Sequence, residues 1–359
     1  MSEGAASGAP PEMLIKKQPF EPCPTGTYAE LKGWIRAQGL LEKQPGFLNR
    51  RILVTLGLLA TSLTLLFLSD SLWFQLPNAA LMAFTFGQIG FIVHDTGHRQ
   101  AYRSQARNNL IGVLHANLLL GMSFGWWVGK HNRHHANPNQ HDLDPDIGMP
   151  IFAFTEEDAL AKRGFYRFMV RYQALFLFPL LFLEAWSLRI GSIYFLLRYE
   201  SRYRALEIGL MALNFVWVAG VAVMTLGVVK GLIFLAVQQA LFGFYMASVF
   251  APNHKGMPVL DKGVEIDFLR QQVLTARNVH PHPLTDYWYG GLNYQIEHHL
   301  FPTLSRNRLR AAHEIVKPFC HKHGIPYQES SMLGSYAEIF GHFHRVSAPL
   351  RRGLRRADR

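Results

Sequence analysis

Four long apolar stretches alternate with polar, basic segments along the chain. The first two cover residues 51–68 and 79–93, and the other two cover residues 206–226 and 231–251. A helix that crosses the hydrocarbon core of a membrane needs roughly 20 mostly apolar residues. The linker within each pair is short, and the two linkers carry one basic residue between them, Lys230. The pattern predicts two hairpins of membrane-spanning helices.

Two further apolar stretches are interrupted by polar residues. Residues 109–129 contain His115, Asn117 and four glycines, which favours a re-entrant or deeply interfacial helix. Residues 165–197 mix apolar runs with four charged residues, a pattern typical of helices that lie in the membrane interface. A short amphipathic helix is also expected at the membrane surface within residues 27–41. The predicted fold is therefore an all-α integral membrane protein, with four transmembrane helices in two hairpins, interfacial helices and a cytosolic cap.

The charge pattern predicts an orientation and three segments. Lys and Arg collect in cytoplasmic loops, so both termini, the central region and the cap are expected in the cytoplasm. Residues 1–50 are predicted to form a partly disordered N-terminal tail, 51–325 the membrane and catalytic domain, and 326–359 a basic C-terminal tail. The first 50 residues lack the short apolar core of a signal peptide. The protein is expected in a membrane, which would be the plasma or inner membrane if the source is bacterial.

The composition limits the kinds of partner that the chain is expected to bind. The net charge is +11, which suits nucleic acid, anionic lipid or an acidic electron carrier. The basic residues flank apolar spans and form no aromatic-interleaved polar surface, so nucleic acid is not expected. The only cysteines are Cys23 and Cys320, which excludes a disulfide framework, a four-cysteine iron–sulfur cluster and a thiolate zinc finger within the chain.

Eight of the 17 histidines form four groups, each just past an apolar stretch. The predicted topology places all four groups on the cytoplasmic side. Residues three or four apart share a helix face, so the members of each of the first two groups are expected to point the same way. The last two histidines are adjacent, so both could bind metal only if they bound two different ions or if the helix were locally distorted. The eight are His94, His98, His131, His134, His135, His254, His298 and His299.

The number of histidines argues for two metal ions. Eight imidazoles are too many for one four-coordinate zinc, and imidazole binds iron, zinc, copper and nickel, so the ligands alone do not select the metal. The apolar surroundings favour oxidation chemistry on a lipid, and no hydrolase nucleophile motif is present. Ligating histidines usually donate their other ring proton to an acceptor. The polar residues expected around them are Asp95, Asp142, Asp144, Asp146, Asn253, Gln295 and Glu297.

Three of the groups resemble the histidine boxes of the membrane fatty-acyl desaturases. The boxes are HDTGH at 94–98, HNRHH at 131–135 and QIEHH at 295–299, in the family's order. The resemblance covers residues 50–325 and includes the two-hairpin topology. Gln295 resembles the variant third box of front-end desaturases and of bacterial acyl-CoA desaturases that lack a fused cytochrome b5. The segment around His254 resembles the stretch that supplies an extra histidine ligand in this family.

The resemblance implies a function and its cofactors. Two iron ions held by the eight histidines would use O₂ and two electrons to place a cis double bond in a long-chain acyl group, carried as acyl-CoA or acyl-lipid. The sequence contains neither the HPGG haem-binding motif nor a GxGxxG dinucleotide motif. Electrons are therefore expected from a separate donor, a ferredoxin or cytochrome b5-type carrier with its NAD(P)H reductase.

Two other functions fit parts of the pattern. A fatty-acid or lipid hydroxylase could use the same scaffold, and the histidine boxes do not discriminate between the two reactions. A histidine-rich metal transporter would place ionisable residues along its spans at mid-membrane. The spans at 51–68 and 206–226 offer only Arg51 and Glu207, both at their ends, which argues against transport.

Overall fold

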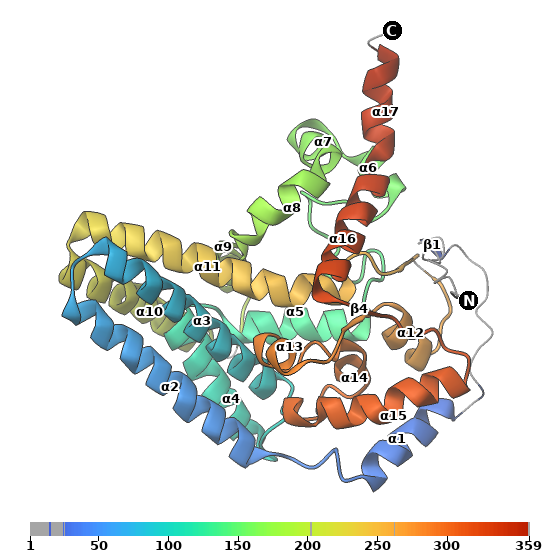
Figure 1. The fold of residues 1–359 in the computed structure, drawn as a ribbon, viewed down its shortest axis with the longest axis horizontal. Coiled ribbons are helices and arrows are strands. Elements are labelled where there is room, and N and C mark those ends of the chain that lie inside the picture. The colour runs from blue at the N-terminus through green and yellow to red at the C-terminus, as the bar shows by residue number, and fades with distance from the viewer. Residues whose placement is uncertain (1–13, 16–23, 25, 202, 262, 358–359) are drawn as a thin grey trace, which may run out of the picture.

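The computed structural model describes residues 14–15, 24, 26–201, 203–261 and 263–357, and most of them are helical (Figure 1). Four helices are long and apolar enough to cross a membrane, as the sequence predicts. They lie side by side as a stem, with the shorter helices gathered toward one end (Figure 1). The all-α membrane fold is confirmed. The four helices are α2 (Pro45–Leu68), α3 (Leu72–Gly97), α10 (Arg204–Leu226) and α11 (Val228–His254).

The first hairpin turns more sharply than its hydropathy suggests. The linker expected over residues 69–78 shrinks to three residues because α3 already begins at Leu72. Two polar side chains fit within the helix because they find partners on α2. Gln75 Nε2 donates to the Leu65 carbonyl at 2.9 Å, and Asn78 Oδ1 accepts from the Ser62 hydroxyl at 2.7 Å. Buried polar groups of this kind stay in a helix when they are hydrogen-bonded.

The stem has two inner and two outer helices. In the spanning windows of α3 and α11, 67% and 56% of residues are buried, against 22% and 17% in α2 and α10. The inner pair packs closely because α3 has a glycine where α11 presents a tyrosine. A Cβ atom on Gly87 would collide with the ring of Tyr245. The inner helices both carry predicted site histidines at their C-terminal ends, His94 on α3 and His254 on α11.

A bent helix pair follows the first hairpin. Helix α4 (Gln105–Val113) continues into the π-helical segment η1 (Leu114–Leu120), and α5 (Phe124–Ala136) then runs at 111° to them. The chain turns at Gly121, which has φ +70°, a conformation that glycine adopts without steric cost. This bend fits the predicted re-entrant helix.

A buried carboxylate holds the start of α5. Glu207 of α10 accepts hydrogen bonds from the Ser123 hydroxyl at 2.5 Å and from the Gly125 backbone N–H at 3.4 Å. Helix N-termini leave N–H groups without intrahelical partners, and a negative charge there is favourable. The second hairpin thereby fixes the helix that carries the second histidine box.

Shorter helices cover residues 156–198. Two of them, α8 and α9, meet at 80°, and α9 packs against α11 and α5. The bend and the short lengths agree with helices that do not cross a membrane as straight spans. The four helices are α6 (Glu156–Ala161), α7 (Gly164–Arg171), α8 (Gln173–Leu181) and α9 (Glu184–Arg198).

The C-terminal third builds the cap. Its helices are α12 (Phe268–Leu274), α13 (Pro283–Trp288), α14 (Gln295–Leu300), η2 (Arg306–Arg308), α15 (Leu309–Lys322), α16 (Met332–Val346) and α17 (Ala348–Ala357). Two short parallel pairs join β1 (Leu14–Ile15) to β2 (Val259–Leu260) and β3 (Asn278–Val279) to β4 (Glu329–Ser330). Helix α16 packs against α8 and α11, so part of the segment 326–359 lies on the body of the protein.

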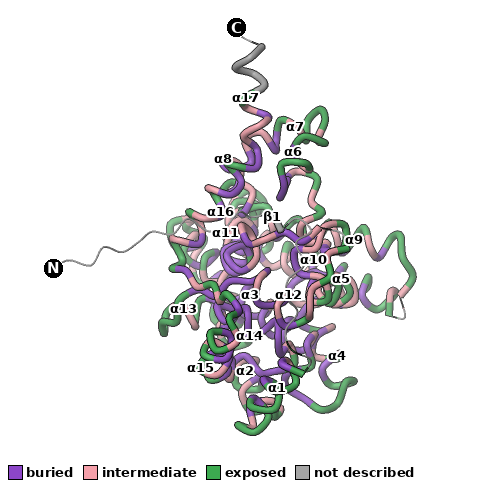
Figure 2. Tube along the Cα trace, turned by 90° about the vertical axis from the view of Figure 1, so that its right-hand side faces the viewer, coloured by how far each residue is buried: buried purple, intermediate pink, exposed green. Residues whose placement is uncertain are grey.

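Helix α1 (Thr27–Ala37) packs on the cap. It contacts α12 and α15, and the side chains of Leu31 and Ile35 are completely buried there. The amphipathic helix exists as predicted, but protein covers these two residues of its apolar face, and only Trp34, which is 41% exposed, is left to face a membrane surface. Buried residues concentrate where α3, α11 and α14 meet (Figure 2).

Candidate metal centre

All eight predicted histidines meet at one place beneath the cap. The ends of α3 and α11 bring His94, His98 and His254 to it, α5 brings the second box, and the buried helix α14 brings the last two. These segments are far apart in the sequence, and only the packing of α3 against α11 and of the cap against both unites them.

The rings divide into two groups. In the first, one nitrogen from each of His94, His98, His131 and His298 lies within 4.8 Å of the others. The second group consists of His134, His254 and His299, with the same maximum separation. His135 lies between the groups, with its Nε2 atom 3.2 Å from His131 Nε2 and its ring stacked on His299 at 4.1 Å.

This division corrects one expectation from the spacing. The members of the second box were expected to point the same way, but His131 belongs to the first group and His134 to the second. The adjacent pair also divides, His298 to the first group and His299 to the second. Adjacent side chains on a helix point in different directions, so α14 contributes one ring to each group.

The outer nitrogens of the second group all face acceptors. The pairs are His134 Nδ1 with Asp144 at 3.0 Å, His254 Nδ1 with the Thr275 carbonyl at 3.0 Å, and His299 Nδ1 with Gln272 Oε1 at 2.9 Å. The Gln272 amide is itself oriented by donating from Nε2 to the His135 carbonyl. A neutral imidazole has one N–H, so a proton on Nδ1 leaves a lone pair on Nε2.

Three Nε2 lone pairs therefore converge. His254 Nε2 lies 3.3 Å from His134 Nε2 and 3.0 Å from His299 Nε2. These contacts have no proton to share and are repulsive unless a cation lies among them. The donor set and its outer acceptors match a histidine metal site, in which the partner of the second nitrogen fixes the ring.

The first group shows the same need in another way. His94 Nε2 lies 3.1 Å from His298 Nε2, and His98 Nε2 is buried without a hydrogen-bond partner among the described residues. Leaving such groups unpaired is costly. Burial lowers the pKa of His298 and His299 well below the usual value for histidine, and the nearby rings add to the shift. Both rings are therefore neutral at neutral pH, which is the form that binds metals.

Asp95 and Asn253, two of the predicted supporting residues, lie directly behind the rings. Asp95 Oδ1 is 3.7 Å from His94 Nδ1, and its carboxylate forms an ion pair with the buried side chain of Arg306. Asn253 donates to Gln295 Oε1 at 3.1 Å. Asp95 thus lies next to a site ring, whereas Asn253 reaches the site through Gln295.

Gln295 reaches the second group itself. Its Nε2 atom is 2.9 Å from His254 Nε2, at the position where a further box histidine would stand. The oxygen and nitrogen of an amide are assigned from its neighbours. Turning the amides of Gln295 and Asn253 together keeps their mutual hydrogen bond and points the Gln295 oxygen at His254 Nε2.

Of the acidic residues expected near the rings, Asp144 makes the direct contact. Asp142 pairs with His141, and Glu297 accepts from Asn278 and Tyr327 in the cap. Asp146 pairs with Lys130 and also lies 3.6 Å from His134 Nδ1. The prediction that Glu297 orients a site histidine is therefore wrong, because its carboxylate faces the cap. Three supporting residues escaped the sequence analysis because no spacing connects them with the boxes, namely Gln272, Thr275 and Arg306.

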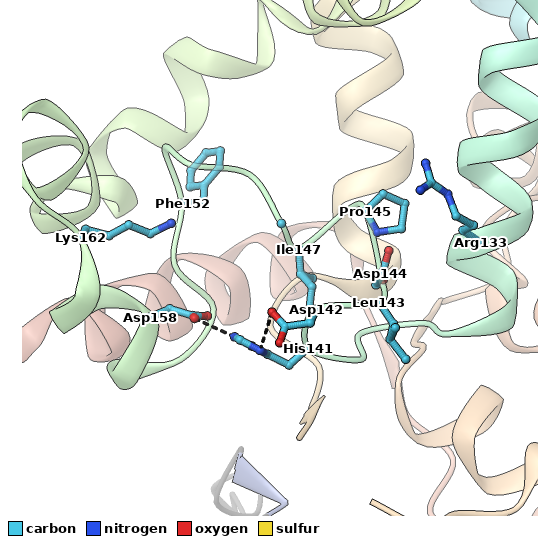
Figure 3. A pocket seen from close by; sticks show the side chains of 11 residues that line it. Arg133, His141, Asp142, Leu143, Asp144, Pro145, Ile147, Phe152, Asp158 and Lys162 are labelled. Atoms are coloured by element: carbon cyan, nitrogen blue, oxygen red, sulfur yellow. Dashed lines mark hydrogen bonds and ion pairs between the residues drawn. The ribbon is translucent and has the colours of Figure 1, made fainter. Parts of the chain in front are cut away.

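A surface pocket lies beside Asp144, whose carboxylate contacts His134 of the second group (Figure 3). It has a volume of about 350 Å³, and Asp144 is part of its wall. Its other charged residues include both signs, and His141 bridges Asp142 and Asp158 within it (Figure 3). A single carboxylate thus separates this pocket from a site histidine.

Comparison with known proteins agrees with this site. The fatty acid desaturase family matches residues 71–331. The chain is 33% identical to the acyl-lipid (9-3)-desaturase of Physcomitrium patens over 87% of its own length and 61% of that protein. It is 30% identical to the Delta(5) fatty acid desaturase of Caenorhabditis elegans, over 90% and 75% of the two lengths. It is also 30% identical to a Delta(8)-fatty-acid desaturase of Euglena gracilis, over 84% and 74%. The chain belongs to the fatty acid desaturase family.

Proposed function

We propose that this protein introduces a cis double bond into a long-chain acyl group, carried as acyl-CoA or acyl-lipid. The reaction consumes O₂, two electrons and two protons, removes two hydrogens from neighbouring carbons and releases two waters. The convergence of three imidazole lone pairs beside a second, four-histidine group supports this proposal most directly. The curated relatives are named as desaturases and give no reason to prefer a hydroxylase.

The residues have separate tasks in this proposal. The seven histidines of the two groups, together with His135 between them, would hold two iron ions, which supply the oxygen-activating redox chemistry when bound. Asp144, Thr275 and Gln272 keep the protons of the second group on the outer nitrogens. The buried position of His298 and His299 keeps water away from their rings.

The orientation follows from where the ligands stand. The ends of α3 and α11 carry site histidines, so the site lies at one membrane face. The charge pattern supports the proposal that this face and both termini are cytoplasmic. Electrons would come from a ferredoxin or cytochrome b5-type carrier with an NAD(P)H reductase. The relatives are named for different positions, among them (9-3), 5, 6 and 8, so their names support no single double-bond position for this protein.

Expression in a desaturase-deficient host tests the proposal. We expect new acyl products lighter by two hydrogens, whose double bonds are mapped by mass spectrometry. Products heavier by one oxygen would assign the protein to the hydroxylases. Purified protein should contain about two irons per chain, and a preparation with one zinc and no iron would contradict the diiron site. His134→Ala should abolish turnover, whereas the same change at exposed His280 is the matched control.

A further inference from the structure

A second pocket lies between the start of α2, helix α13 and the segment after α14. Its volume is about 340 Å³. No histidine lines it, so it is distinct from the metal centre. Its wall includes the side chains of Arg51, Asp286, Tyr287, Arg306 and Arg310.

The pocket is positively charged. Three arginines and a single carboxylate line it. The carboxylate of Asp286 is already engaged, because its oxygens accept from Asn293 Nδ2 at 2.8 Å and from the Tyr294 hydroxyl at 3.0 Å. Arg310 lies only at the limit of an ion pair with it, at 3.8 Å, and its side chain is 62% exposed.

Arg51 has no acidic partner among the described residues. Its guanidinium donates to the neutral amide of Gln88 and lies over the ring of Tyr287, 5.6 Å from the ring centre. A half-buried guanidinium without a carboxylate retains both charge and unused donors. Arg51 and Arg310 therefore offer two incompletely paired cations to one pocket.

Arg306 forms a rigid cationic wall. It is buried, pairs with Asp95 and donates to the Gly290 carbonyl. A side chain at Gly290 would collide with this guanidinium, so the turn is built closely around it. A preorganised charge costs little to orient when an anion binds. Through Asp95, the same residue reaches His94 of the first histidine group.

The position of the pocket suits an amphiphile. Arg51 immediately precedes the apolar run of α2, so the pocket lies at the level where a membrane changes from polar to apolar. Aromatic rings extend from it along the stem. Tyr287 stacks on Phe84 with ring centres 6.0 Å apart, and Phe84 stacks on Tyr245 at 5.4 Å. A ligand with an anionic head and an apolar tail could place its head at the arginines and its tail along the aromatic rings.

We propose that this pocket binds the phosphate group of the molecule that carries the acyl chain. Arginine matches phosphate oxygens with paired, charge-assisted hydrogen bonds. The proposal rests on the proposed function in assuming that the acyl carrier is the ligand. Two sources share this chemistry, the phosphate of a phospholipid head and the phosphates of coenzyme A.

Binding measurements on the full-length protein in a phosphate-free detergent test the proposal. The probes are oleoyl-CoA and dioleoylphosphatidylglycerol, with oleoyl-N-acetylcysteamine and dioleoylglycerol as phosphate-free comparators. We expect Arg51→Gln and Arg310→Gln each to raise the Kd of a phosphate-bearing probe about tenfold, the loss of one charge-assisted contact. Arg103→Gln removes an exposed arginine outside the pocket and should leave every Kd unchanged. Arg306 is left intact because it also supports Asp95.

The outcome identifies the source. If the two arginine variants lose affinity for oleoyl-CoA alone, the pocket binds coenzyme A. If they lose affinity for the phospholipid alone, it binds a lipid head. Equal affinity of the wild type for probes with and without phosphate would overturn the proposal, as would an equal effect of Arg103→Gln. Binding is measured without turnover, and iron content and melting temperature are compared for each variant. Binding that depends on phosphate in a protein that makes no double bond would reject the desaturase function alone.

Discussion

The carboxylate of Asp144 lies 3.0 Å from Nδ1 of His134, the ring nitrogen opposite the one that faces His254. The same carboxylate accepts from the backbone N–H groups of Asn139 and Asp146, each at 2.8 Å. It is therefore held in place before any metal binds. The turn that contains Asp144 thus favours the proton on Nδ1 of His134.

Asp144→Asn should weaken metal binding. An amide oriented by the same N–H groups cannot hold the proton on His134 Nδ1 as a carboxylate does, and loss of such a supporting group typically costs about ten- to a hundredfold in affinity or activity. Iron content after dialysis against graded chelator measures this effect. Asp142→Asn is the control, because Asp142 pairs with His141. Equal iron retention in both variants would contradict the role of Asp144.

His254→Ala should remove one metal and leave the other. His254 belongs to the second group only, and the four rings of the first group do not include it. We expect iron to fall from about two to about one per chain. The melting temperature should change little by comparison with this halving. Elemental analysis of the purified variant checks this, with His280→Ala as a surface control. Loss of both irons would show that the two groups are filled as one unit.

Gly290→Ala should destabilise the protein more than Gly324→Ala. The two glycines have nearly equal φ values, +61° and +64°, so each alanine bears the same backbone cost of about 1–2 kcal/mol. At Gly290 the new methyl group also meets the Arg306 guanidinium and the ring of Phe91, whereas nothing lies within 4 Å at Gly324. Crowding of this kind adds about 1–3 kcal/mol. Thermal unfolding in detergent compares the two, and equal shifts would mean that both Arg306 and Phe91 move away freely.

His342 should make the fold sensitive to acid. Burial lowers its pKa to about 4, well below the usual histidine value near 6.5. The folded protein therefore prefers the neutral ring. The stabilisation is complete above about pH 6.5 and is lost as the pH falls toward 4, with a maximum of about 3 kcal/mol.

The measurement compares unfolding midpoints of the wild type and His342→Leu at several pH values in that window. The leucine variant should lose less stability on acidification because it has no proton to take up. His344→Leu, two residues further on and exposed, is the matched control. A variant at position 342 that follows the wild-type pH profile would contradict the assignment.

Much of the stem could be predicted from the sequence. The four spans follow from apolar length alone, because a membrane leaves a helix few alternatives. Their boundaries could not, since Gln75 and Asn78 look like linker residues until their partners on α2 are known. The apolar face of α1 predicts a helix, but Leu31 and Ile35 do not reveal whether lipid or protein covers them.

By itself, the sequence determined which residues could hold metals. Spacing and position after apolar stretches selected all eight histidines, because closely spaced imidazoles beside membrane spans have few other uses. Only the tertiary structure decided how they are shared. His131 and His134 stand in one box yet serve different groups, and Gln272 completes the site from a helix without a motif. A metal site depends on the direction of each ring and on the atom behind it, and both are fixed by packing between segments far apart in the chain.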